Sequence, residues 1–197
     1  MNRISFGKKI IVVLFAGVVL ITAVVLSAAA AKKSVQNSSS GFQEVILANE
    51  DYFPALLKCI DEARNEILIS IFSFKTGEHK NSYPDQILSH LAKAVERGVK
   101  VFVVLETTSG KSDELNIQNR QTGRLLEEKG IKVFFDSPRK TTHTKLVVID
   151  QRLIFLGSHN FTQSALKYNN EISILLDNSD MAKNARDYIL KIIKEAK

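Results

Sequence analysis

Cysteine, proline, glycine and tryptophan are scarce in this chain. Its 197 residues include one cysteine, three prolines, nine glycines and no tryptophan. The lone Cys59 excludes an intramolecular disulfide framework and a zinc site built from cysteines. The few prolines and glycines exclude collagen-like and proline-rich low-complexity sequence. Charged residues make up 24% of the chain, close to the globular average, so we expect one folded domain of ordinary size.

The net charge of +6 does not by itself indicate a nucleic-acid-binding protein. Residues 1–31 contain three basic residues and no acidic ones, which leaves +3 for the rest of the chain. A body with so small an excess of positive charge is only mildly basic. Evidence for function must therefore come from motifs.

The amino terminus has the pattern of an export or anchoring segment. Residues 10–31 are uncharged and follow a short basic stretch containing Arg3, Lys8 and Lys9. A helix of this length covers roughly 30 Å of hydrocarbon, and the small residues 27–31 also fit a signal cleavage site. Residues 1–31 are thus predicted to be either a signal peptide or a membrane anchor, with the anchor favoured. From the basic start we expect the body to lie outside the cytoplasm, which is the periplasm if the cell is Gram-negative.

Strand and helix patterns alternate after a predicted flexible linker at residues 32–41. β-Branched and aromatic runs predict strands, and apolar residues at helical spacing predict helices. The fold class expected for the catalytic domain, residues 42–197, is α/β, with a mixed β-sheet flanked by helices on both faces. Strands are predicted at 42–47, 67–74, 99–105, 131–135, 146–149, 153–156 and 171–176; helices are predicted at 53–63, 87–95, 118–129 and 180–194, the last capped by Asp180.

One segment carries residues suited to phosphate chemistry. His143 and Lys145 are two apart in a predicted strand, so they share a face, whereas Asp150 has the opposite parity and is expected to be structural. An ammonium attracts phosphate oxygens, and an imidazole can attack or transfer a proton. Asn160 follows the next strand, which turns back beside the first. Glu171 opens a further strand and is the best candidate to fix the imidazole tautomer.

The segment from His143 to Asn160 resembles the signature of the phospholipase D superfamily. That signature reads His-x-Lys, four residues, Asp, six residues, Gly-Ser-x-Asn. Each fixed position has its counterpart here, and the resemblance extends to Glu171. The matching residues are His143, Lys145, Asp150, Gly157, Ser158 and Asn160.

The resemblance implies a phospholipase D/nuclease-like fold and a phosphodiesterase that needs no metal or other cofactor. His143 would form a phosphohistidine in one copy of the motif and act as acid and base in the other. Lys145 and Asn160 would hold phosphate oxygens, and Glu171 would orient His143. Gly157, Ser158 and Asp150 would hold these residues in place without contacting the phosphate themselves.

The motif occurs once in the chain, although the implied chemistry needs two histidines in different protonation states. We therefore expect a homodimer with the active site on its twofold axis, because a twofold axis brings a surface against its own copy.

The substrate remains open between nucleic acid and phospholipid. Arg139, Lys140 and Arg152 belong to a basic stretch around the motif and are predicted to bind a polyanion. Together with the polar loops, this favours an exported or membrane-anchored nuclease. A phospholipase D acting on the membrane that residues 10–31 contact is the second candidate. An inactive module that binds nucleic acid or lipid headgroups is the third.

Overall fold

The computed structural model describes residues 44–77, 81–108, 110, 113–137 and 139–196. The predicted signal or anchor at residues 1–31 and the linker at 32–41 lie outside these ranges. Among the helices within them, none has both the length and the apolar character needed to cross a membrane.

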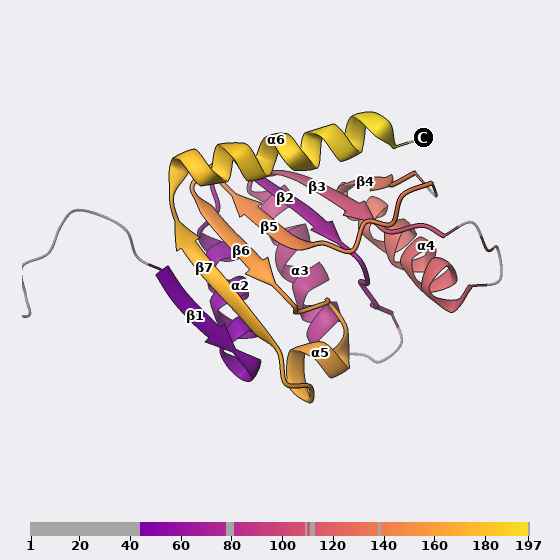
Figure 1. Ribbon diagram of the computed structural model, residues 1–197, viewed down its shortest axis with the longest axis horizontal. Helices are drawn as coiled ribbons and strands as arrows, with labels where there is room; N and C mark the ends of the chain where they lie inside the picture. Colours follow the sequence, from indigo (N-terminus) through magenta and orange to yellow (C-terminus); the bar gives the residue numbers. More distant parts are fainter. Residues whose placement is uncertain (1–43, 78–80, 109, 111–112, 138, 197) are drawn as a thin grey trace, which may run out of the picture. The chain divides into compact units, whose positions relative to one another are not determined.

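Seven strands form one mixed sheet in the order β1-β7-β6-β5-β2-β3-β4 (Figure 1). The strands β2, β3 and β4 run parallel, and all other neighbours are antiparallel. The bounds are β1 Glu44–Ala48, β2 Glu66–Ile71, β3 Lys100–Leu105, β4 Lys132–Phe135, β5 Lys145–Ile149, β6 Leu153–Gly157 and β7 Ile172–Asp177.

Helices cover the two faces of the sheet unequally. The described helices are η1 Asn49–Asp51, α2 Tyr52–Glu62, α3 Tyr83–Glu96, α4 Glu114–Glu127, α5 Gln163–Lys167 and α6 Ser179–Glu195. Residues of α2, α3, α4 and α5 share one apolar core, whereas α6 contributes to a second core on the opposite face. In Figure 1, α6 crosses only one end of that face. The structure confirms the predicted fold class, a mixed sheet with helices on both faces.

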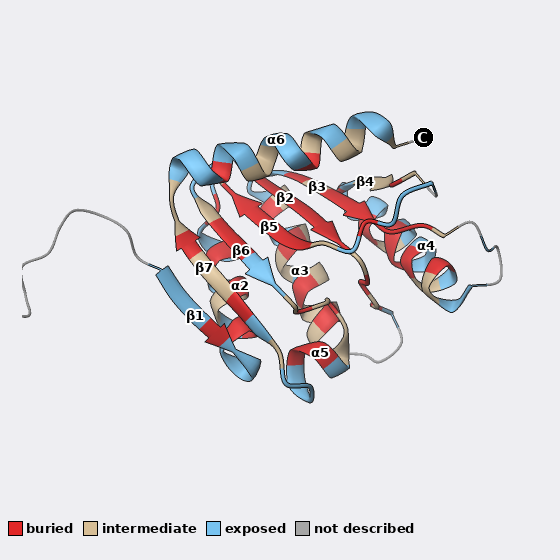
Figure 2. Cartoon of the chain, viewed as in Figure 1, coloured by how far each residue is buried: buried red, intermediate tan, exposed pale blue. Residues whose placement is uncertain are grey.

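Alternation along the central strand separates the two cores. Ile67, Ile69 and Ile71 belong to the core under α2 and α3, whereas Leu68 packs in the core under α6. All six residues of β2 are buried, as Figure 2 shows for the middle of the sheet. A strand buried on both faces is expected to be apolar at nearly every position, which explains the continuous run in the sequence.

Two features of the elements differ from the sequence predictions. The last helix is capped by Asn178 and not by Asp180: the Asn178 side-chain oxygen accepts hydrogen bonds from the amides of Asp180 and Met181. Asp180 lies in the first turn, where a negative charge complements the positive end of the helix. The short helix α5 was not predicted, because five residues do not establish a helical period.

Backbone contacts draw the motif loops to one end of the sheet. The amide of Phe72, just past β2, donates to the Thr144 carbonyl at 2.9 Å. The amide of Phe161 donates to the Ser73 carbonyl at 3.0 Å. The segments before β5 and after β6 are therefore both tied to the residues that follow β2.

Candidate active site

His143 and Lys145 lie at the start of β5 and share one aromatic neighbour. His143 is separated from the strand by Thr144 and is exposed, whereas Lys145, the first residue of the strand, is only 8% exposed. The His143 ring meets the Phe72 ring edge-on, with 4.6 Å between the ring centroids. The Lys145 Nζ lies 4.9 Å from the centroid of the same Phe72 ring. The imidazole and the ammonium therefore flank a single aromatic side chain.

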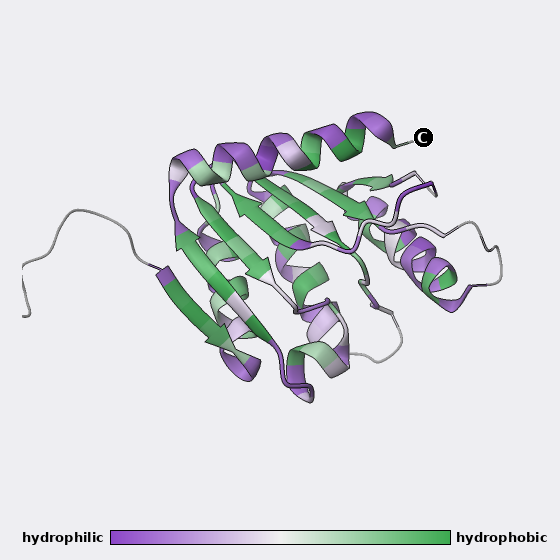
Figure 3. Cartoon of the chain, in the orientation of Figure 1, coloured by the Kyte–Doolittle hydropathy of each residue, from purple (hydrophilic) through white to green (hydrophobic). Residues whose placement is uncertain are grey.

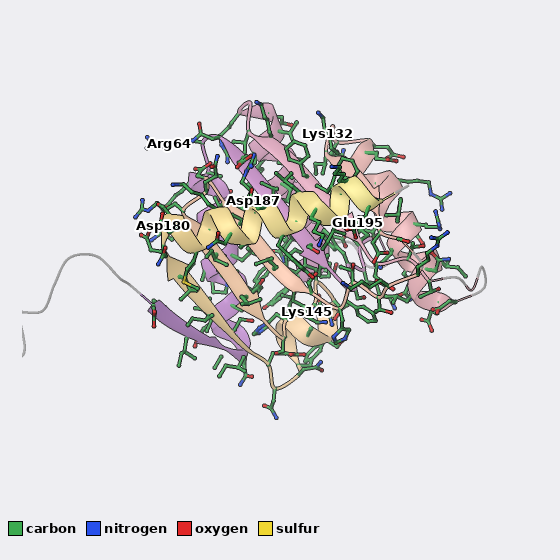
Figure 4. The ribbon with its side chains drawn as sticks, turned by 45° about the horizontal axis from the view of Figure 1, so that its top comes forward. Arg64, Lys132, Lys145, Asp180, Asp187 and Glu195 are labelled. Carbon is green, nitrogen blue, oxygen red and sulfur yellow. The ribbon has the colours of Figure 1, made fainter. Side chains whose placement is uncertain are left out.

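The Lys145 ammonium is partly desolvated and retains capacity to bind an anion. Its Nζ donates a hydrogen bond to the His143 carbonyl oxygen at 3.0 Å. Burial lowers the pKa of Lys145, and the negative charge of Glu171 acts in the opposite direction. An ammonium carries three donors, so the single carbonyl partner within the described residues leaves donors for phosphate oxygens. Figure 4 shows Lys145 at the end of the sheet that α6 leaves uncovered.

Asn160 reaches the same end of the sheet from the loop after β6. Its side-chain oxygen accepts a hydrogen bond from the Ser73 amide at 3.3 Å. Ser73 directly follows Phe72, the side chain that His143 and Lys145 contact. With its oxygen turned toward the backbone, the Asn160 amide group has its two donors for other partners.

Glu171 lies just before β7 and holds polar groups of the motif loop. Its carboxylate accepts hydrogen bonds from the Ser158 hydroxyl and, at 3.1 Å, from the Asn169 amide. No hydrogen bond joins Glu171 to His143 in the single chain, although both residues are described. Within one chain, Glu171 therefore acts on Ser158 directly and on the Lys145 charge through space.

Gly157 is required by the close approach of β6 and β7. A Cβ atom at this position would lie 2.2 Å from the Ser173 hydroxyl oxygen and 2.5 Å from the Ile172 carbonyl oxygen. Any larger residue would push β7 away from β6. Since Glu171 immediately precedes β7, such a shift would displace its carboxylate.

Asp150 and Arg152 lie in the turn between β5 and β6, at the opposite end of β5 from His143. This placement agrees with the structural role that its parity predicted for Asp150, and it corrects the expectations that Asp150 supports the motif residues and that Arg152 lies beside them. The Asp150 carboxylate accepts from the amides of Arg64, Asn65 and Glu66 and thereby fixes the start of β2. Arg152 forms an ion pair with Asp177. Asp150 lies seven residues after His143, about 23 Å at the rise of an extended strand, and Arg152 lies in the same turn. Figure 4 accordingly shows Arg64 and Lys145 far apart.

Arg139 and Lys140, in contrast, lie in the loop that leads into His143. Both are exposed. Lys140 lines a cleft of about 60 Å³ together with Thr142, Tyr188 and Lys191, and the acidic Glu195 also contributes to it. The sequence indicated the two loop residues but not their proximity to α6, because that contact joins segments about fifty residues apart.

Phe72 and Asn49 contact residues of the site, but the sequence analysis did not identify them. Phe72 lies about seventy residues before His143, and only the pairing of β2 with β5 brings them together. Asn49 binds the backbone of Glu171 from the turn after β1. Neither belongs to a motif, so a single sequence holds no signal for them. Across the described ranges, no three histidine, cysteine or acidic side chains are grouped as metal ligands.

Comparison with known proteins places this arrangement in a family. A family model described as "Cardiolipin synthase, PLD-like domain" matches residues 56–193, which contain the whole motif. The chain belongs to the PLD-like domain family. The PLD-like segment accounts for most of the described residues.

Curated PLD-like relatives carry several names. The chain is 27% identical to cardiolipin synthase A of Buchnera aphidicola over 132 residues, 66% of this chain and 25% of the relative. It is 25% identical to mouse mitochondrial cardiolipin hydrolase over 136 residues, 67% of this chain and 53% of the relative. It is also 25% identical to a polyphosphate kinase of Exiguobacterium over 158 residues, 72% of this chain and 21% of the relative. The chain thus spans about a quarter or less of the synthase and the kinase.

Solved structures share the fold over nearly their full length. Nuc, a phospholipase D family member from Salmonella typhimurium, superposes with a TM-score of 0.66 at 21% identity, covering 80% of this chain and 97% of Nuc. NucT from Helicobacter pylori gives 0.65 at 21% identity, covering 79% and 98%. These likenesses establish the PLD-like fold for this chain.

Proposed function

We propose that this chain is a metal-independent phosphodiesterase that acts through a phosphohistidine. The observation that carries the proposal is the pairing of an exposed imidazole, His143, with a partly buried ammonium, Lys145, across Phe72. A ring nitrogen of His143 forms a bond to phosphorus while the bond from phosphorus to the leaving oxygen breaks. The Lys145 ammonium neutralises the charge of the phosphate oxygens, and the Asn160 side-chain amide donates hydrogen bonds to them. Water then hydrolyses the phosphorus–nitrogen bond.

The leaving oxygen needs a proton, and a second copy of the chain is proposed to supply it. The Nδ1 atom of His90 lies 2.7 Å from an Asp61 carboxylate oxygen, in a hydrogen bond between α3 and α2, and His159 is completely buried. His79 lies outside the described residues. Of the histidines that the structure describes, His143 is thus the one with an exposed ring and no hydrogen-bond partner. A twofold dimer would set a protonated His143 opposite a neutral one.

An uncovered part of the sheet offers a surface for the second copy. Ile46, Leu156 and Ile172 are 68%, 48% and 60% exposed. Ile46 on β1 and Leu156 on β6 both pair with Ile174 on β7, so the three residues form a row across neighbouring strands. Figure 3 shows the hydrophobic face of β1, β7 and β6 beside α6. This apolar sheet surface, defined by Ile46, Leu156 and Ile172, adjoins Gly157 and Glu171 in the chain, so burying it would bring two sites together.

Nucleic acid is the proposed substrate. Lys140 and Lys191 line one cleft with the half-exposed ring of Tyr188, and the cleft adjoins the loop that ends at His143. Ammonium groups bind a phosphate backbone without regard to sequence, and an aromatic ring stacks on a base. We further propose that residues 10–31 export or anchor the enzyme, with the catalytic domain outside the cytoplasm.

Phospholipid is the second candidate substrate. The apolar sheet surface beside the site is the observation that favours it, and two of the curated relatives are named for cardiolipin. If the apolar sheet surface contacts a membrane and not a second copy, the substrate would be a lipid headgroup next to the bilayer.

The test uses the full-length chain in detergent with a chelator present. Labelled single-stranded DNA, RNA, duplex DNA, cardiolipin and phosphatidylcholine are offered separately. We expect cleavage of nucleic acid, and a loss of at least about a thousandfold in His143→Asn. His90→Asn is the control, because His90 pairs with Asp61 away from the motif.

Each other outcome points to a different alternative. Cleavage of lipid alone would replace the nuclease by a phospholipase. Activity that vanishes with the chelator would contradict a metal-independent mechanism. Binding without cleavage would identify an inactive module, and full activity in His143→Asn would remove His143 from the site.

A further inference from the structure

His159 occupies the variable position of the Gly-Ser-x-Asn motif and is completely buried. Its Nε2 lies 3.1 Å from the Asn49 carbonyl oxygen, and its Nδ1 lies 2.7 Å from the Ser173 hydroxyl. The ring also stacks on Tyr52, with 4.2 Å between the centroids and 7° between the planes. Because these three neighbours contact the imidazole, its position and orientation are fixed.

The partners of His159 define its tautomer. A carbonyl oxygen only accepts, so Nε2 carries the hydrogen that it donates to Asn49. The Ser173 hydroxyl then donates to the unprotonated Nδ1. Burial lowers the pKa of His159, which keeps the ring neutral. Gly157 leaves the space in which the Ser173 hydroxyl lies.

Asn49, the acceptor of the His159 hydrogen bond, clamps Glu171 by both backbone groups. Its amide donates to the Glu171 carbonyl oxygen at 2.9 Å. Its side-chain oxygen accepts from the Glu171 amide, also at 2.9 Å. Asn49 adopts a φ of +51°, in the left-handed region that asparagine tolerates better than most residues. The turn is therefore built to present these groups to Glu171.

The clamp determines where the Glu171 carboxylate lies. With its backbone held at both the amide and the carbonyl, Glu171 accepts a hydrogen bond from the Ser158 hydroxyl. Its negative charge also favours the protonated form of Lys145 and so raises the Lys145 pKa. Asn49 and Tyr52 precede residue 56, where the match to the family model begins. The clamp thus comes from a segment of this chain outside the matched region.

We propose that Asn49 and His159 are positioning residues for the phosphodiesterase reaction, with His159 bracing the Asn49 turn and Asn49 holding Glu171 in place beside Ser158 and Lys145. The inference rests on the proposed function, because it assigns a role to the setting of Glu171. It concerns turnover and not substrate affinity, since His159 is completely buried and the side-chain oxygen of Asn49 accepts from the Glu171 amide.

A matched pair of variants separates the clamp from the fold of the turn. Asn49→Gly keeps the positive φ and the carbonyl that His159 binds but removes the oxygen that holds the Glu171 amide. Asn49→Asp restores an acceptor at that place. Asn81→Gly is the control, because Asn81 has a φ of +67° in a loop before α3.

Two measurements are made on the full-length chain: kcat and KM with bis(p-nitrophenyl) phosphate, and hydrogen exchange of the Glu171 amide. For Asn49→Gly we expect kcat to fall about tenfold with KM within twofold, and the Glu171 amide to exchange about tenfold faster. Asn49→Asp should recover most of both losses, and Asn81→Gly should match the unchanged chain.

The two readouts distinguish failure of the clamp from failure of the proposed function. An unchanged kcat in Asn49→Gly, or a Glu171 amide that exchanges at the original rate, would overturn the positioning role. If the unchanged chain does not cleave phosphodiesters at all, the proposed function fails and the positioning role falls with it. Faster exchange of the Glu171 amide in Asn49→Gly would then show only that the turn is structural.

Discussion

At the scale of single residues, the least expected feature is a pair of buried carboxyl groups behind the His143 loop. Glu106 and Asp136 follow β3 and β4 and are 2% and 3% exposed. Burial and a hydrogen bond to Asp136 raise the pKa of Glu106 to about 7. The Thr142 amide donates to Glu106, so the pair anchors the residue next to His143. A buried carboxyl group beside a second one favours its protonated form, because burial and the neighbouring negative charge both disfavour ionisation of Glu106.

The stability of the chain should therefore depend on the protonation of Glu106. Its pKa is 4.5 when exposed and about 7 in the folded chain, so folding retains a proton that the unfolded chain releases between these values. The stabilisation is complete below pH 4.5 and is lost as the pH rises through 7, by at most about 1.4 kcal/mol per pH unit. In Glu106→Gln this part of the dependence of the unfolding free energy on pH should vanish. A side-chain amide at position 106 donates to Asp136 and accepts from Thr142 at every pH.

Urea unfolding of the two proteins across this pH range measures the difference between their slopes. Glu127→Gln, at an exposed position of α4, is the control and should follow the unchanged chain. Parallel curves for the unchanged chain and Glu106→Gln would contradict the raised pKa of Glu106.

The motif residues show how far single positions are predictable. The fixed spacing of the motif predicts His143, Lys145 and Asn160 as site residues, and the start of the next predicted strand adds Glu171, because each pattern is local; their catalytic roles stay predictions. Glu106 and Asp136 give no such signal, since two acidic residues thirty positions apart become a pair only when β3 and β4 lie side by side.

At the scale of elements, the sequence predicted whether a segment is a helix or a strand better than it predicted the residues at which the segment begins and ends. Runs of β-branched and aromatic residues indicated the strands. The signal is strongest for β2 and β5, in which every residue is buried, because burial on both faces favours a continuous apolar run. The start of α6 was wrong by two residues: asparagine and aspartate are both good caps, and only the backbone of Asn178, extended with φ −149° and ψ 109°, decides between them.

The cap assignment predicts an order of stabilities. Asn178→Ala removes an oxygen that accepts from two amides and should lower the free energy of unfolding by about 1 kcal/mol. Asp180→Ala should cost less, because its charge complements the helix end and otherwise forms only an exposed ion pair with Lys183. Ser179→Ala is the control. Thermal or urea unfolding gives the order, and a larger loss in Asp180→Ala would return the cap to that residue.

At the scale of the whole molecule, the order of the strands could not be predicted from the sequence. That order determines which residues come together at the site. The placement of β5 between β2 and β6 sets His143 against Phe72 and moves Asp150 and Arg152 to the far end. It also leaves one part of the sheet face uncovered by α6 (Figure 3), which is where the apolar sheet surface lies.

If that surface binds a second copy, one charge on it should separate the dimer. Ile46 is 68% exposed in the single chain, so Ile46→Glu should leave the fold intact while placing two buried carboxylates in the interface. We expect sedimentation to change from dimer to monomer and turnover to fall with it. Ile117→Glu, at a position 52% exposed on α4, should remain dimeric. A dimeric Ile46→Glu would move the interface elsewhere.

Mixed dimers test whether the two copies share one site. A site that needs two imidazoles is inactive whenever one copy carries His143→Asn. If equal amounts of both chains are unfolded together and refolded, about one quarter of the dimers contain two unchanged chains. Activity per unchanged chain should then fall to about half, and further as the variant is added in excess. Independent sites would keep that activity constant at every ratio. A mixture of the unchanged chain with the monomeric Ile46→Glu should show no such loss, because a chain that cannot pair cannot interfere.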